Sequence, residues 1–156
     1  KASLHMNMAA RLNPNSPRTI VSCAMGLAFF GDHDSAGDLL EHSLRCAPLM
    51  LDYQWCYAAS VYFLAGDYES ALTAARRGRD RIIDNPGWHA ATLVKLGKPE
   101  EASQQFRKLV EAVGLNWNRN EPATPKAVFD WFTEIYPMRR DEEKQALAGA
   151  LADIAY

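Results

Sequence analysis

The sequence predicts an all-α fold built from stacked helix–turn–helix units. The main indication is a motif, a glycine followed five residues later by an alanine, which occurs three times at spacings of 35 and 31 residues. A recurring unit of this length is typical of helical hairpins that pack side by side. No segment shows the alternation of apolar and polar residues that marks a half-buried strand. The three copies of the motif are Gly31 to Ala36, Gly66 to Ala71 and Gly97 to Ala102.

Composition restricts the class of protein further. The 156 residues suffice for one domain or about four short repeats. A net charge of −2 argues against a general nucleic-acid binder, which is usually strongly basic. No apolar run approaches the roughly 20 residues that span a bilayer. The cysteines Cys23, Cys46 and Cys56 form no CxxC pair, so we expect a reducing, cytoplasmic setting.

The first predicted helix covers residues 1–12. Leu4, Met8 and Leu12 recur every four residues, and Asn13-Pro14 ends the pattern. No capping residue precedes this helix. We therefore expect this helix to open a fragment of a longer protein.

Six further helices follow, and they pair into three hairpins. A turn glycine tolerates the left-handed conformation at a helix end, and Asp32 and Asp67 can cap the helices that follow. Pro99 stands where a proline is welcome in a first helical turn. A small residue five positions after the glycine lets the paired helices cross closely. The expected helices are residues 17–30, 33–46, 52–65, 68–83, 88–96 and 99–113, in the units 17–48, 52–86 and 87–114.

The middle unit resembles the tetratricopeptide repeat, a helical hairpin of roughly 34 residues. It carries the large–small–aromatic–Gly–Ala spacing of that family in Trp55, Ala59, Tyr62, Gly66 and Ala71. The resemblance covers about residues 1–113, and it implies that residues 1–14 are the second half of a repeat. It implies a right-handed superhelical array that binds a protein or peptide on its inner, concave face.

In this family the first helix of each hairpin supplies the concave face. The resemblance therefore implies a partner-binding groove, which we expect to take an amphipathic helix because it is apolar. The alternative is that the chain's own C-terminal helices cover Met25, Phe29 and Phe63. No carboxylate clamp is expected, because the positions that would need basic or Asn residues hold other side chains. The groove residues are Arg18, Val21, Met25, Phe29, Tyr53, Cys56, Ser60, Phe63 and Lys95.

The remaining residues, 125–156, predict two C-terminal helices that close the array. Phe129, Phe132 and Tyr136 share one helical face, which would cap the stack or form a dimer contact. The aromatic–Pro–basic sequence around Tyr136-Pro137 resembles the closing segment of repeat arrays in bacterial signalling proteins. In those proteins the array follows a class III adenylate or guanylate cyclase domain or a winged-helix domain. The resemblance implies a regulatory or scaffolding role.

No residue cluster predicts catalysis, a cofactor or a metal. The chain lacks GxSxG, Walker and HExxH motifs, so we expect no enzyme activity in this fragment. Asp32-His33-Asp34 lacks the spacing of an EF-hand, and His42 with Cys46 would be only half a metal site. We expect the arginines of residues 76–81 to lie on a solvated helix surface and Trp117 to fold back onto the adjacent helix.

These observations leave several functions open. The first is a protein–protein interaction module, the regulatory or scaffolding part of a larger signalling protein. The others are a homodimerisation module, a helical-repeat RNA binder, which the pI of about 6.1 disfavours, and a sensor of a small molecule.

Overall fold

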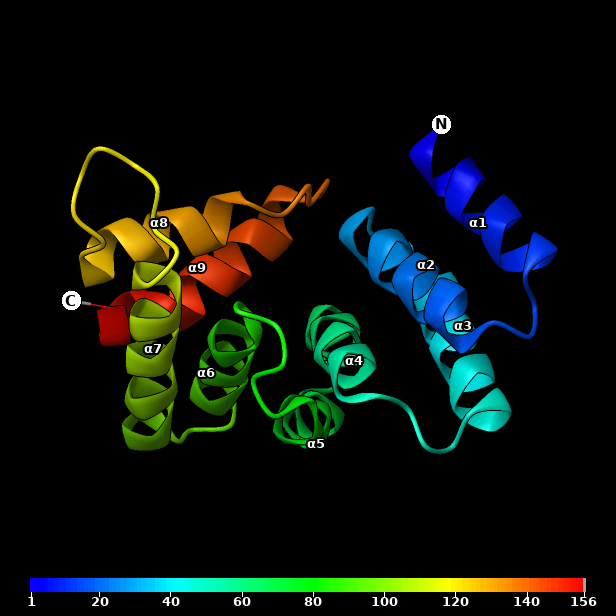
Figure 1. The fold of residues 1–156 in the computed structure, drawn as a ribbon, viewed down its shortest axis with the longest axis horizontal. Coiled ribbons are helices and arrows are strands. Elements are labelled where there is room, and N and C mark those ends of the chain that lie inside the picture. Colours follow the sequence, from blue (N-terminus) through cyan, green and yellow to red (C-terminus); the bar gives the residue numbers. More distant parts are fainter. Residues whose placement is uncertain (156) are drawn as a thin grey trace.

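The computed structural model describes residues 1–155, and every regular element in this range is an α-helix (Figure 1). The all-α prediction is therefore confirmed. Among the described residues, no helix combines the length and apolar character needed to cross a membrane. The helices are α1 (Ala2–Leu12), α2 (Pro17–Phe29), α3 (His33–Cys46), α4 (Asp52–Leu64), α5 (Tyr68–Gly78), α6 (Asn85–Lys95), α7 (Pro99–Gly114), α8 (Pro125–Glu134) and α9 (Asp141–Ala155).

The second to seventh helices pack as three hairpins, α2 with α3, α4 with α5 and α6 with α7. The turn glycines Gly31, Gly66 and Gly97 all have positive φ, between 71° and 80°, which glycine adopts without steric cost. Asp32 and Asp67 cap the next helices by accepting hydrogen bonds from the backbone N–H of Ser35 and Ser70. The alanines that follow, Ala36, Ala71 and Ala102, are completely buried.

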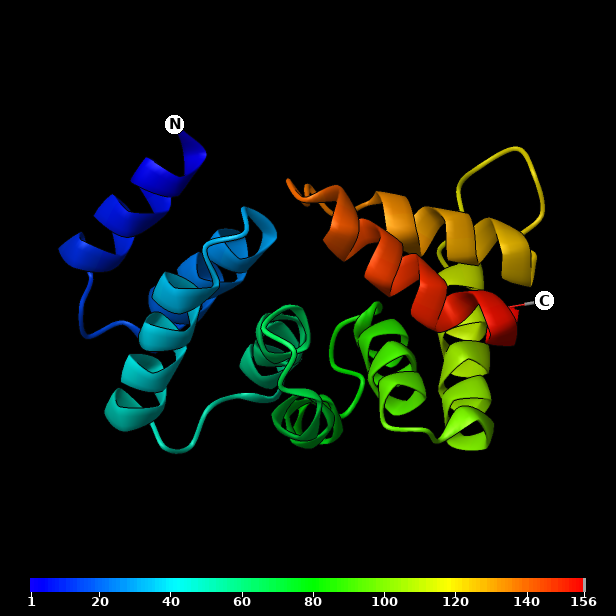
Figure 2. The same ribbon diagram turned by 180° about the vertical axis from the view of Figure 1, so that it is seen from behind.

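Consecutive hairpins contact one another in chain order. The first helices pack in series, α2 on α4 and α4 on α6, and α1 packs on α2. The first seven helices follow an arc from α1 to α7, and α8 and α9 lie within its inner side (Figures 1 and 2). Helix α9 contacts α6 and α7, and α8 contacts α7. The linker between α8 and α9 extends back to the end of α2.

Two helix boundaries differ from the prediction by more than one residue. Helix α5 ends at Gly78 and not at residue 83, because Arg79 and Asp80 adopt left-handed backbone conformations, with φ of 49° and 54°. Helix α6 begins at Asn85 and not at residue 88. Asn85 is buried, and its side-chain amide donates to the carbonyl of Ala75 at 2.9 Å. This contact ties the start of α6 to the end of α5.

Candidate functional site

The structure buries most of the expected concave face. Five of its nine residues are at most 5% exposed, and they pack between helices. They present no surface to a partner. We therefore correct the expected groove, because these side chains belong to the interior: Val21, Phe29, Cys56, Ser60 and Phe63.

The chain's own C-terminal segment covers the inner side of the arc. Phe29 stacks on Tyr136 with ring centroids 5.1 Å apart, and Phe63 meets Trp88 at 5.5 Å. Trp88 in turn contacts Phe132 of α8 at 5.7 Å. Met25, only partly buried, packs against the same cluster. The sequence left open whether this face binds a partner or is covered by the chain's own C-terminal residues. In the structure, C-terminal residues cover it.

A partly buried polar chain fixes the covering segment to α6. The hydroxyl of Tyr136 donates to Asp84 Oδ2 at 2.6 Å, and the indole N–H of Trp88 donates to the Tyr136 oxygen at 3.0 Å. Burial raises the pKa of Asp84, although the hydrogen bond from Tyr136 opposes the change. Burial also raises the pKa of Tyr136 well above its ordinary value. The three groups satisfy one another, so their arrangement serves structure.

Two of the other predicted residues, Arg18 and Tyr53, line an open groove between α2 and α4. Its volume is about 820 Å³. Lys95 lies exposed at the end of α6 and does not contribute to it. We call this surface the α2–α4 groove. Its lining residues are Pro17, Arg18, Ser22, Ala47, Leu49, Leu51, Tyr53, Gln54, Tyr57 and Ile82.

The α2–α4 groove leaves large apolar side chains in solvent. Leu49 is 93% exposed and Leu51 is 62% exposed. Tyr53 and Tyr57 meet edge to face beside them, with centroids 5.8 Å apart. Buried Gln54 accepts a hydrogen bond from the backbone N–H of Leu51 at 2.8 Å and holds the loop in place. The result is an apolar surface on a fixed backbone.

Arg18 is the only charged residue that lines the groove. Within the described part of the chain, no carboxylate lies within ion-pair distance of its guanidinium. An apolar groove with a cation at its edge is complementary to an apolar segment that carries a carboxylate.

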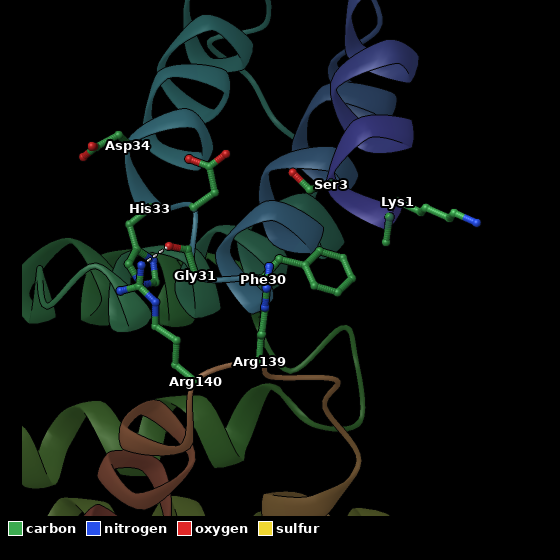
Figure 3. Close-up of a pocket in the computed structure, with 10 residues that line it drawn as sticks. Lys1, Ser3, Phe30, Gly31, His33, Asp34, Arg139 and Arg140 are labelled. Atoms are coloured by element: carbon green, nitrogen blue, oxygen red, sulfur yellow. Dashed lines mark hydrogen bonds between the residues drawn. The ribbon is translucent and has the colours of Figure 1, made fainter.

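A second cavity, of about 720 Å³, lies where the α2–α3 turn meets the α8–α9 linker and the start of α1 (Figure 3). Arg139 and Arg140 approach it from the linker, and His33 and Asp34 from the start of α3. Lys1 and Ser3 lie on its other side. Cations and carboxylates are mixed around this cavity, so its charges do not favour one sign of ligand.

The contacts behind this cavity join the two ends of the molecule. The backbone N–H of Arg139 donates to the carbonyl of Phe29 at 2.9 Å, and Arg140 Nη2 donates to the carbonyl of Gly31 at 2.6 Å. His33 Nε2 lies 2.6 Å from Glu143 Oε1. We call these six residues the clasp: Phe29, Gly31, His33, Arg139, Arg140 and Glu143.

Two of the four arginines of residues 76–81 have side-chain partners within the chain. Arg76 lies 3.7 Å from Glu101, and Arg77 covers the ring of Trp55 at 4.6 Å. These contacts favour a structural role for that part of the cluster.

The described residues contain no group of three or more potential metal ligands. His42 Nε2 lies 3.5 Å from Cys46 Sγ but only 2.7 Å from the carbonyl of Pro14, so its closest partner is a backbone oxygen. Trp117 donates to the carbonyl of Glu121 and packs against the core cluster. The sequence predicts that it folds back onto the adjacent helix, α7, whose Leu109 and Val113 belong to the same cluster.

Sequence reasoning missed the residues that give the α2–α4 groove its character. Leu49 and Leu51 flank a buried methionine, Met50, in the loop between two hairpins. The apolar run Leu49-Met50-Leu51, in a loop, was the sequence signal that could have identified this surface. The clasp had no such signal, because its residues come from positions about 110 apart in the sequence.

Comparison of the chain with models of protein families, with curated proteins and with solved structures finds no match.

Proposed function

We propose that this chain is a protein-interaction module of the tetratricopeptide kind, and that its α2–α4 groove binds an apolar segment of a partner protein. The observation that carries the proposal is the exposure of Leu49 and Leu51 beside the Tyr53–Tyr57 pair. The packing of three hairpins in chain order, with buried alanines at the crossings, supports the right-handed array that the resemblance implies.

The chemistry of the groove indicates the kind of segment it binds. Burying one exposed leucine contributes about 1.5–3 kcal/mol, so two leucines supply a useful part of the binding free energy. Arg18 adds preference for a carboxylate near one edge. An amphipathic helix with a leucine stripe and neighbouring glutamates meets both requirements.

In this proposal the chain binds and does not catalyse, and it needs no cofactor. The resemblance of the tail to arrays in bacterial cyclases and winged-helix regulators supports a regulatory or scaffolding role in a cytoplasmic signalling protein.

Homodimerisation is the second candidate, and it has its own supporting observation. Leu4, Met8 and Leu12 are all exposed on one face of α1. Their spacing of four places them on the side of the helix away from Met6 and Ala10, which face α2. Light scattering over a range of concentrations distinguishes this candidate, because self-association through α1 raises the mass of the isolated chain.

The experiment for the groove is a titration with a fluorescent synthetic helix that carries a leucine stripe and flanking glutamates. We expect Leu49→Ser to weaken binding about tenfold, which corresponds to about 1.4 kcal/mol. The thermal stability should change little, because the side chain is in solvent. The matched control is Leu115→Ser, at a leucine 88% exposed just after α7.

Exchanging the glutamates of the synthetic helix for lysines tests the role of Arg18, and we expect weaker binding. Wild-type affinity in folded Leu49→Ser, or equal loss in Leu115→Ser, would exclude the groove as the binding surface.

A further inference from the structure

Helix α2 belongs to two features of the molecule at once. Near its N-terminal end, Pro17, Arg18 and Ser22 line the α2–α4 groove. At its C-terminal end, the carbonyl of Phe29 accepts the hydrogen bond from Arg139 in the clasp. The two features therefore lie at opposite ends of one helix of 13 residues, about 20 Å long.

The middle of α2 is suited to transmit a displacement. Its residues Ala24, Leu27 and Ala28 are completely buried in the core that α2 shares with α4. Packed helices move as rigid bodies and shift against each other in small steps. A change in the position of one end of α2 therefore alters the position of the other end relative to α4.

The clasp is the contact that holds the C-terminal end of α2 to the far end of the chain. A Cβ at Gly31 would collide with the side chain of Arg140, so the close approach depends on glycine. The contacts are polar, and the Arg140 side chain is half exposed. A half-exposed polar contact such as that of Arg140 contributes little stability, whereas the His33–Glu143 pair is more buried, with side chains 22% and 11% exposed. The core of the fold contains neither contact, so both can break while the fold persists.

The C-terminal helices do not depend on the clasp for their own packing. Phe132 of α8 and Leu147 and Leu151 of α9 are completely buried in the core that they share with α6 and α7. Opening the clasp therefore loosens the end of the first hairpin, where the stacking of Phe29 on Tyr136 remains, and leaves α8 and α9 in position.

We infer that the clasp regulates the α2–α4 groove: closed, it fixes α2 against α4 and keeps the groove in its binding shape, and open, it lets α2 tilt and the groove loosen. This inference rests on the proposed function of the groove. Loss of a preorganised shape weakens binding, because the order must be restored on association. Any modification or partner that occupies Arg140 or Glu143 would act on the groove from its distant end.

The first test needs no ligand. We compare the NMR spectra of wild type, His33→Ala/Arg140→Ala and the control Arg45→Ala. The control removes an arginine of α3 that pairs only with Glu41, within its own helix. We expect hydrogen exchange of the Arg139 amide to accelerate about tenfold in the double variant. The signals of Tyr53 and Leu51 should shift, whereas Arg45→Ala leaves both measurements unchanged.

Unshifted signals at Tyr53 and Leu51 in a folded double variant, despite faster exchange at Arg139, would overturn the coupling. Unchanged exchange at Arg139 would show that these side chains do not hold the clasp, and would overturn the inference as well.

The second test repeats the titration with the leucine–glutamate helix. We expect the double variant to bind at least about fivefold more weakly than wild type and Arg45→Ala, at the low end of typical coupling between sites. Equal affinities would contradict the inference. Failure of wild type itself to bind would count against the proposed function, while the ligand-free spectra would still decide whether the clasp moves the groove.

Discussion

At the α6–α7 end of the molecule, Trp88 and Phe132 are buried among other aromatic rings, whereas at the α1–α4 end Leu12 and Leu49 are 77% and 93% exposed. Both ends carry large apolar side chains. The difference is that α8 and α9 cover the first end and no described segment covers the second. Apolar character alone therefore does not mark a recognition surface, since the most aromatic face of this chain is part of its own core.

The comparison also separates two roles of polar groups. At the covered end, the partly buried groups Asp84, Trp88 and Tyr136 satisfy one another. At the open end, Arg18 lines the groove without a carboxylate beside it, among the described residues. A polar group with its partners in place holds the structure together, and a charge without one is available to a ligand.

The largest expected effect on stability is that of deleting an aromatic ring at the covered end, compared with deleting one at the open end. Trp88→Ala removes contacts with Phe29, Phe63, Phe132 and Tyr136, and we expect it to lower the free energy of unfolding by about 3–5 kcal/mol. Tyr53→Ala, in the groove, should cost about 1 kcal/mol or less. Urea denaturation measures both. Similar losses at the two sites would contradict the distinction between a covered and an open end.

The next effect contrasts two glycines inside helices. A Cβ on Gly87 of α6 would collide with the ring of Phe132, so we expect Gly87→Ala to destabilise by about 1–3 kcal/mol. Gly37 of α3 has open space around it, and Gly37→Ala should stabilise by about 0.5–1 kcal/mol through helix propensity. Thermal denaturation measures whether each variant is less or more stable than wild type. A stabilising Gly87→Ala would mean that α8 does not press against α6.

The smallest effect is a pH dependence. Burial, aided by the positive charge of Arg76, lowers the pKa of His89 from its ordinary 6.5 to about 4. Between these values the unfolded chain binds the proton and the folded chain does not, so stability is complete above pH 6.5 and falls as the pH drops towards 4.

The substitution His89→Gln should reduce this acid sensitivity, measured as the urea midpoint against pH. His5→Gln is the control at the open end, since His5 is exposed on α1. An equal change in both variants would show that His89 is not the group responsible.

The sequence predicted the helices well where local signals agreed. The glycine turns, the caps at Asp32 and Asp67 and the buried alanines are confirmed. The predicted end of α5, residue 83, was wrong, because Arg79 and Asp80 adopt left-handed conformations. These conformations accompany the packing of α5 against α4 and α6, and no local sequence pattern indicates that packing. The close packing is evident at Gly78, where an added Cβ atom would lie 2.6 Å from Sγ of Cys56 in α4.

Local patterns also could not decide which residues of the expected groove stay exposed. Helical spacing identified which residues share a face, including Arg18 and Tyr53, which do line an open groove. It could not show that residues of α8 and of its linker to α9 would pack over Phe29 and Trp88, since that depends on contacts between Phe29 and Tyr136 across more than 100 residues.

By itself, the sequence determined the all-helical fold and the hairpin turns, because helix periodicity, glycine conformation and capping act over a few neighbouring residues. Only the tertiary structure decided which apolar face is core and which is exposed. That outcome depends on the path of α8 and α9 back across the arc and on the clasp at Gly31 and Arg140, where packing between distant segments competes for the same surface.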